Sequence, residues 1–278
     1  MSRRKSPLVS ALFKLTRAGM RQSARIGKAA ARQGIESGSK MAEGAGRMMK
    51  AVATPTDAPV PVTGGRWIDG RWGPGPLAMR RYRLFIPTGG SARKPLPLLL
   101  LLHGCAQDTA AFAAVTRAAA TAKARGFAVL MPEQAQEANP QRCWNWFGSE
   151  TRVGIETQIL MSIVDHVLAD YPRVGGPLFA LGLSAGGSMA LTLALRHPDR
   201  FAALAPIHAA ADRFGLWQET RGCPPRQDLP RHIQYLLAAS NPLDLAFNLS
   251  NTYSYVQHAA TGKAADSART LAGMLESV

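Results

Sequence analysis

The stretch that decides the fold is residues 178–187, which read LFALGLSAGG. An apolar run is followed by the pattern G-x-S-x-G and then by a segment that predicts a helix through Leu195. A serine in this context is typical of a sharp strand-to-helix turn that presents a nucleophile above a sheet. We therefore expect Ser184 to be a nucleophile and the backbone N–H of Ala185 to face negative charge developing on a carbonyl oxygen. The alternative is a tight turn with an incidental serine.

Apolar runs that resemble buried strands recur on both sides of this stretch. The clearest are residues 96–102, 127–131 and 201–207, and helices are expected from Asp108 or Thr109 to about Arg125 and over residues 154–169. Two strands, residues 66–72 and 77–86, are expected to meet at the Gly-Pro turn of residues 73–76. Strands that alternate with helices predict an α/β fold, a mostly parallel sheet flanked by helices.

The charge of the chain is concentrated at one end. Residues 1–50 carry twelve of the 33 basic residues and two of the 18 acidic ones, so they supply +10 of the net charge of +15. Their basic residues recur at helical spacing, so this tail is expected to be either an amphipathic helix for an anionic surface or a solvated segment. Because the remainder is only weakly basic, no specific nucleic-acid partner is expected.

Composition also predicts the domain organisation. We expect a tail (residues 1–50), a Pro- and Gly-rich linker (51–65), an α/β core (66–211) and a divergent or truncated C-terminal region (212–278). Within that region, residues 213–231 lack the pattern of the expected strands and helices. No apolar run is long enough for a membrane span. The three cysteines do not show zinc-ligand spacing, so no metal is expected.

A second hydrogen-bond donor for an oxyanion is expected after the strand at residues 96–102. That strand ends in His103-Gly104-Cys105, and the N–H of Cys105 is the candidate donor. Nothing in the sequence pairs His103 with Ser184, so His103 is expected to hold the loop by hydrogen bonds and to take no part in proton transfer.

Four blocks of sequence resemble the polyhydroxybutyrate depolymerase-type esterases, which are α/β-hydrolases related to feruloyl and acetylxylan esterases. They are HGCAQD (residues 103–108), PEQ (132–134), NPQRCWNWF (139–147) and GLSAGG (182–187). GRW (65–67) and RYRLFIP (81–87) are similar as well, so the resemblance spans about residues 64–210.

The resemblance implies a serine hydrolase of short-chain hydroxyacyl polyesters or related esters, with no cofactor. It makes Ser184 the nucleophile and Cys105 and Ala185 the oxyanion donors. It places Cys143 near Cys105, where a disulfide would form in an oxidising compartment. Trp144 and Trp146 would wall the substrate cleft; the alternative for this pair is core packing under a long loop.

The sequence departs from the family after residue 207. A serine hydrolase of this fold needs an acid and then a histidine later in the chain, but the family's Asp and His motifs are not found there. Asp244 and His258 satisfy the chain order and are the weak candidates; His208 follows a strand directly and is not expected to be the base. The sheet is therefore expected to lack or alter its last strands.

Two functions follow from these features. The first is a serine esterase that acts on a small ester or polyester through a Ser184 acyl-enzyme. The alternative is a catalytically weak or inactive hydrolase-fold protein that binds polyester granules or another anionic surface through residues 1–50. The absence of a readable signal peptide slightly favours a cytoplasmic location, whereas the resemblance points to an extracellular one.

Overall fold

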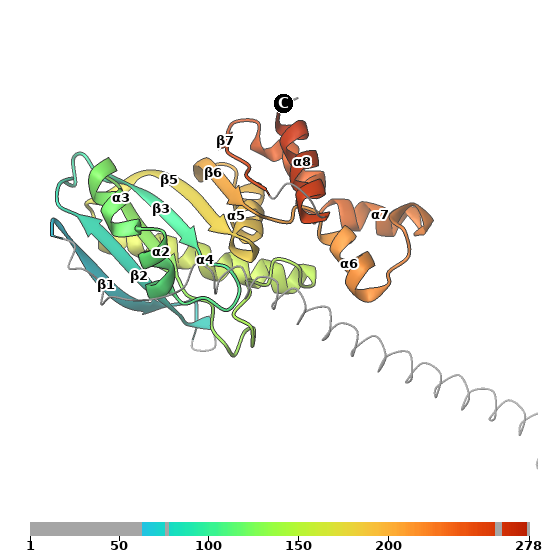
Figure 1. Ribbon diagram of the computed structural model, residues 1–278, viewed down its shortest axis with the longest axis horizontal. Coiled ribbons are helices and arrows are strands. Elements are labelled where there is room, and N and C mark those ends of the chain that lie inside the picture. The colour runs from blue at the N-terminus through green and yellow to red at the C-terminus, as the bar shows by residue number, and fades with distance from the viewer. Residues whose placement is uncertain (1–62, 76–77, 259–262, 277–278) are drawn as a thin grey trace, which may run out of the picture.

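The computed structural model describes residues 63–75, 78–258 and 263–276 (Figure 1). The expected basic tail of residues 1–50 and most of the expected linker lie outside the described residues.

One mixed sheet forms the centre of the described part of the chain (Figure 1). Its spatial order is β1-β2-β4-β3-β5-β6-β7, with β1 and β2 antiparallel to their neighbours and the strands from β4 to β7 mutually parallel. This arrangement confirms the predicted α/β class. The strands are β1 (Gly65–Trp72), β2 (Arg80–Pro87), β3 (Leu96–Leu102), β4 (Ala128–Pro132), β5 (Val174–Leu183), β6 (Phe201–Ile207) and β7 (Tyr253–Ser254).

Helices cover both faces of the sheet, which explains why its central strands are apolar throughout. Successive residues of a strand point to opposite faces. Leu100 therefore packs with α4 (Glu150–Asp170) and α5 (Ala185–Arg196), whereas Leu101 packs with α2 (Thr109–Val115) and α3 (Ala118–Arg125). The two apolar layers hold the carboxyl ends of β3 and β5 side by side, where the candidate site lies.

The segment from residue 109 to 125 differs from its prediction. One helix was expected, but α2 ends at Val115 and α3 begins at Ala118. The Thr116 hydroxyl donates a hydrogen bond to the Phe112 carbonyl oxygen, at 2.7 Å, and Arg117 adopts a left-handed conformation with φ 51°. A left-handed residue cannot continue an α-helix, so the single-helix prediction was wrong.

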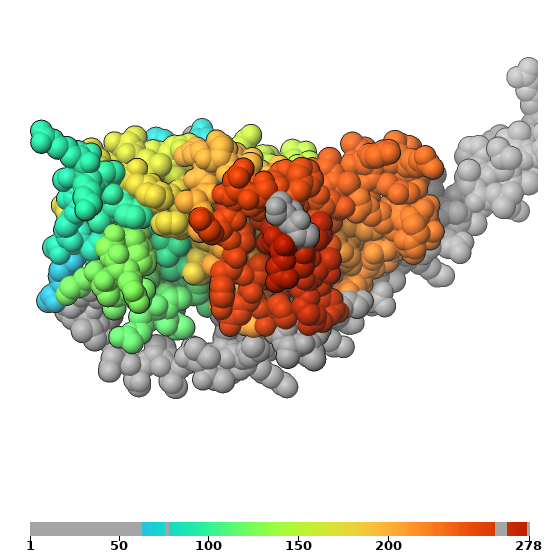
Figure 2. Space-filling model, turned by 90° about the horizontal axis from the view of Figure 1, so that it is seen from above, coloured from blue at the N-terminus to red at the C-terminus, as the bar shows by residue number. Residues whose placement is uncertain are grey.

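The prediction that the stretch after Asp212, residues 213–231, lacks helices was also wrong, because α6 lies within it. The C-terminal region forms α6 (Arg213–Arg221), η2 (Arg226–Asp228), α7 (Arg231–Ala238), η3 (Leu243–Leu249) and α8 (Lys263–Glu276). Asp212 caps α6 by accepting a hydrogen bond from the Gly215 N–H at 3.0 Å, a start signal that the sequence contained. Figure 2 shows these elements, orange to red, gathered over one part of the molecule.

The last strand of the sheet is short, as expected. β7 has two residues and is the edge of the sheet, beyond which the structure describes no further strand. Beyond β7 the chain stays next to the end of β6. Ile207 forms an isolated parallel bridge with Gln257, and the Gln257 carbonyl accepts a hydrogen bond from the His208 N–H at 2.6 Å. No helix among the described residues is long and apolar enough to cross a membrane.

Candidate active site

Ser184 is the single residue that connects the end of β5 at Leu183 to the start of α5 at Ala185. Its backbone has φ 55° and ψ −121°, a conformation that a non-glycine residue adopts at a cost of about 1–3 kcal/mol. The conformation is held from both sides, because the Ser184 N–H donates to the Ile207 carbonyl at 2.8 Å and its carbonyl accepts from the Ser188 N–H at 3.0 Å. The residue is exposed at the N-terminus of α5. Ser184 thus lies exposed at a sharp turn between a strand and a helix.

The glycines around Ser184 are required by backbone packing. A Cβ on Gly182 would lie 2.2 Å from the Gly186 carbonyl oxygen, and one on Gly186 would lie 2.3 Å from the Leu102 carbonyl oxygen. Non-bonded atoms do not approach so closely, so only glycine fits at either position. These contacts also bring the end of β3 against the first turn of α5, next to Ser184.

The two candidate oxyanion donors flank this contact. Gly104 lies beside the end of β5, since a Cβ there would be 3.4 Å from the Leu183 carbonyl oxygen, and Cys105 follows it. Within the described part of the chain, neither the Cys105 N–H nor the Ala185 N–H donates a hydrogen bond. Ala185 is the first residue of α5, where the helix dipole places partial positive charge. Both N–H groups are therefore unpaired near Ser184.

His103 is structural, as expected. Its side chain is fully buried, Nδ1 donates to the Gly104 carbonyl at 2.7 Å and Nε2 accepts from the Gln134 N–H at 3.1 Å. Burial lowers the pKa of this imidazole, which keeps it neutral. With both nitrogens occupied, His103 has no lone pair for the Ser184 proton.

A second segment braces the loop that carries Cys105. We call residues 103–109 the oxyanion loop and residues 133–146 the bracing segment. The disulfide implied by the resemblance joins them between Cys105 and Cys143. Hydrogen bonds also join the two segments, at His103–Gln134, at Ala106–Gln141 (2.8 Å), at Thr109–Glu133 (3.0 and 3.2 Å) and at His103–Trp144.

Glu133 and Gln107 were not identified as site residues from the sequence. Burial alone would raise the pKa of Glu133, but hydrogen bonds from Thr109 and the nearby Arg81 hold that pKa below its usual value. Gln107 Oε1 accepts from the Gly104 N–H at 2.6 Å. Both belong to blocks that carry the family resemblance, but their partners follow only from the folded loop.

The two tryptophans lie in the core. Trp144 is 0% and Trp146 4% exposed, and both belong to the larger apolar cluster. Trp144 Nε1 donates to the His103 carbonyl at 2.9 Å, so it supports the oxyanion loop from beneath. This placement corrects the expectation of a cleft wall and matches the alternative of core packing: indole rings this large stabilise most when fully removed from water.

The weak candidates Asp244 and His258 do not meet. Asp244 lies in the first turn of η3, where both its oxygens accept from Arg226 at 2.8 Å and one also accepts from Asn241. The Asp244 carboxylate is thus committed to a guanidinium, and none of its described contacts is with His258. His258 follows Gln257 at the edge of the sheet.

His208 directly follows β6, the strand next to β5 in the sheet. Leu183 pairs with Ile207 in the parallel β5–β6 ladder, so Ser184 and His208 leave adjacent strands at the same level. His208 is half-buried and has φ 50°, a second left-handed residue at this edge. No imidazole in the described part of the chain is hydrogen-bonded to the Ser184 hydroxyl.

About half of the chain is similar to known esterases. Residues 80–216 match the family model "Esterase PHB depolymerase". Poly(3-hydroxyalkanoate) depolymerase C of Paucimonas lemoignei is 35% identical over 136 residues, which are 48% of this chain and 31% of that protein. Feruloyl esterase B of Neurospora crassa is 28% identical over 143 residues, 50% of this chain and 47% of that protein. The chain thus spans less than half the length of either relative.

Solved structures agree on the fold. A ferulic acid esterase superposes with a TM-score of 0.56 at 18% identity, covering 77% of this chain and 86% of that one. Carboxyl esterase 2 of Tuber melanosporum gives 0.53 at 14% identity, covering 81% and 79%. Residues 80–216, just under half of the chain, thus match the polyhydroxybutyrate depolymerase-type esterase family, and the described part of the chain has the fold of these esterases.

Proposed function

We propose that the protein is a serine carboxylic ester hydrolase that works through a Ser184 acyl-enzyme. The observation that carries the proposal is the exposed Ser184 on its left-handed turn, at the start of α5. The unpaired N–H groups of Cys105 and Ala185 supply the oxyanion hole. The match of residues 80–216 to the esterase family model supports this chemistry over the alternative of an inert surface binder, whose basic tail lies outside the described residues.

The reaction requires two acyl transfers. The Ser184 oxygen bonds to the ester carbonyl carbon and gives its proton to a base, while the carbonyl oxygen becomes an oxyanion bound by the two N–H groups. Collapse breaks the bond to the alcohol, which leaves with that proton. Water then attacks the acyl-enzyme, the acid is released, and Ser184 regains its hydrogen.

We propose short-chain hydroxyacyl esters, including polyester oligomers, as the substrates. The support is the relative named as a poly(3-hydroxyalkanoate) depolymerase, whereas the relative named as a feruloyl esterase favours aromatic acyl groups. We expect the protein to release 3-hydroxybutyrate from its ester-linked trimer at least about tenfold faster, in kcat/KM, than ferulate from methyl ferulate, a discrimination of about 1.4 kcal/mol. Liquid chromatography of both reactions measures this ratio, and a preference for methyl ferulate would contradict the proposed class.

We propose His208 as the base that takes the Ser184 proton. Adjacent strands lie about 4.7–4.9 Å apart, and the register places His208 at the level of Ser184 on the neighbouring strand. His258, the sequence-based candidate, is one strand further away. Catalytic hydrogen bonds are often formed only with substrate present, so the unpaired imidazole is compatible with this role.

Replacing His208 with alanine is expected to lower kcat for p-nitrophenyl butyrate by about 10²–10⁴, the usual contribution of a general base. His258→Ala is expected to lower it by less than about fivefold, and His232→Ala, on the exposed start of α7, serves as the control. Stopped-flow release of p-nitrophenol measures all three. A large loss in His258→Ala with His208→Ala unchanged would transfer the role to His258.

A further inference from the structure

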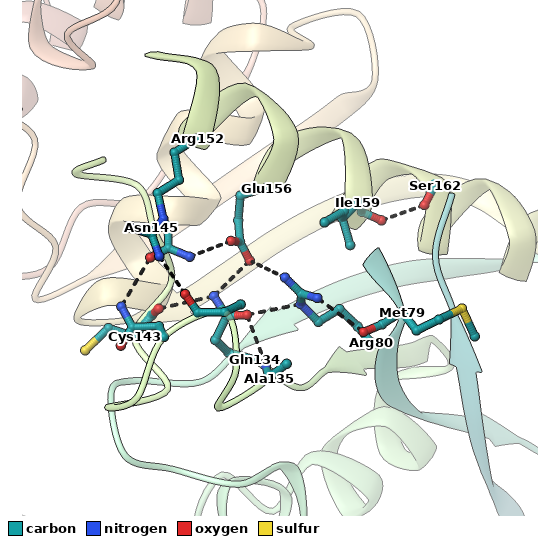
Figure 3. A network of polar contacts seen from close by, with 12 residues as sticks. Met79, Arg80, Gln134, Ala135, Cys143, Asn145, Arg152, Glu156, Ile159 and Ser162 are labelled. Carbon is teal, nitrogen blue, oxygen red and sulfur yellow. Dashed lines mark hydrogen bonds and ion pairs between the residues drawn. The ribbon is translucent and has the colours of Figure 1, made fainter. Parts of the chain in front are cut away.

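A buried polar network connects α4 to the bracing segment (Figure 3). Its centre is Glu156, which is 2% exposed. Glu156 Oε1 accepts from Gln134 Nε2 at 2.9 Å, and Oε2 accepts from Asn145 Nδ2 at 2.8 Å. The guanidinium of Arg80, 5% exposed and on β2, lies 3.8 Å from Oε1. One carboxylate therefore holds three side chains that are remote from it in sequence.

Gln134 links Glu156 to the oxyanion loop through hydrogen bonds. Its backbone N–H donates to His103 Nε2 at 3.1 Å, and its side chain donates to the Cys143 carbonyl at 3.2 Å. Its Oε1 accepts from Arg80 Nε at 3.1 Å. Because Cys143 is bonded to Cys105, both contacts of Gln134 end at the loop whose N–H is the candidate oxyanion donor.

Asn145 makes a second connection. Besides donating to Glu156, it accepts at Oδ1 from Asn139 Nδ2 at 3.2 Å, and Asn139 Oδ1 accepts from the Gln141 N–H at 3.0 Å. The Gln141 carbonyl in turn accepts from the Ala106 N–H at 2.8 Å. Two hydrogen-bonded routes thus run from Glu156 to the residues on either side of Cys105.

We propose that Glu156 is a positioning residue that sets the direction of the Cys105 N–H, an inference that rests on the proposed function. A buried ion pair contributes little to stability compared with apolar packing of the same volume, so stability alone does not account for a charge here. A carboxylate with two oxygens fixes two amide donors at once, through hydrogen bonds stronger than those between neutral groups. An oxyanion donor acts only when it is aimed within a few tenths of an ångström, so a rigid support behind it has direct consequences for rate.

Glu156→Gln tests this role. One acceptor oxygen becomes an NH₂ group that must face the amide NH₂ of Gln134 or Asn145, so one hydrogen bond is lost, and Arg80 loses its carboxylate partner. We expect kcat for p-nitrophenyl butyrate to fall at least about tenfold while KM changes less than about threefold, since the oxyanion exists only in the transition state. The rate of phosphonylation by a fluorophosphonate, whose P=O oxygen occupies the same hole, should fall to a similar extent.

Val164→Ala is the matched control, because Val164 is fully buried two turns further along α4 and belongs to the apolar cluster instead of the network. Both variants are measured well below their melting temperatures. The inference is supported if Glu156→Gln loses kcat and Val164→Ala stays within about threefold of the wild type. Equal kcat losses at equal losses of melting temperature would mean that Glu156 only stabilises the fold, which would overturn it.

Asn145→Ala provides a milder change if Glu156→Gln does not fold. It cuts one route while leaving the contacts of Glu156 with Gln134 and Arg80 in place. We expect a loss of about threefold to tenfold in kcat, again without a matching change in KM; an unchanged kcat would overturn the inference. Wild-type protein that does not react with the fluorophosphonate would instead contradict the proposed function, so the two failures are distinguishable.

Discussion

Ser184→Ala is expected to lower kcat/KM for p-nitrophenyl butyrate by about 10⁴-fold or more. The alanine removes the only atom that forms the acyl-enzyme, while the left-handed turn and both oxyanion N–H groups remain. A residual acceleration of about 10³–10⁴ over water can survive loss of the nucleophile, because bound water can still attack a polarised carbonyl. Initial rates over a range of ester concentrations, corrected for spontaneous hydrolysis, measure the effect.

Ser162→Ala is the control for that substitution. Ser162 lies on α4 and donates only to the Ile159 carbonyl one turn back, at 2.7 Å. Its removal is expected to leave kcat/KM within about twofold of the wild type, because a hydroxyl that bonds its own helix contributes little. Loss of activity in Ser162→Ala with retention in Ser184→Ala would contradict the assignment of Ser184.

Gly186→Ala is expected to destabilise the fold by more than about 3 kcal/mol, among the largest effects of single substitutions. The new methyl carbon would lie 2.3 and 2.4 Å from the carbonyl oxygens of Leu102 and His103. Both obstacles are backbone, so they cannot rotate away as a side chain would. Relief requires β3 and α5 to separate, which disrupts the two layers and moves the oxyanion loop away from Ser184. Urea unfolding followed by circular dichroism measures the loss.

Gly154→Ala separates this clash from the general effect of the substitution. Gly154 is in α4, and a Cβ there meets no atom within 4 Å. It is expected to stabilise the protein by about 0.4–1 kcal/mol through the lower entropy of the unfolded chain. If Gly186→Ala were as stable as Gly154→Ala, the close packing at the elbow would be wrong.

The parts of the fold that could be predicted are those specified by local sequence. The runs at residues 96–102 and 201–207 became β3 and β6 with the same bounds, because continuous apolar stretches must be covered on both faces. The G-x-S-x-G pattern located the turn at Ser184, since the contact that requires glycine at position 182 is with Gly186, four residues later in the same pattern.

Features that depend on distant partners were missed. The break before α3 occurs at Arg117, which has a left-handed backbone conformation. No residue type in the segment predicts that conformation. The burial of Trp144 depends on the His103 carbonyl, 41 residues earlier. Likewise, the role of Glu156 arises from Arg80 and Gln134, and helical spacing on α4 alone would place it only as one polar residue among apolar ones.

The charged partners of the site were the hardest to predict. Chain order alone suggested Asp244 as the acid, but in the folded chain its carboxylate accepts hydrogen bonds from Arg226, 18 residues earlier. His208 was not expected to be the base because it directly follows a strand; the register of β5 and β6 places it at the level of Ser184, which is the ground on which we propose it. Such register is set by pairing between strands and is not readable from either strand alone.

The most direct measurement of whether Ser184 is an activated nucleophile is covalent labelling. The folded wild-type protein is reacted with a fluorophosphonate and digested, and mass spectrometry identifies the labelled peptide. We expect stoichiometric modification on Ser184, prevented by prior unfolding in urea. Intact protein that stays unlabelled, or carries its label on another residue, would contradict the acyl-transfer chemistry proposed for this elbow.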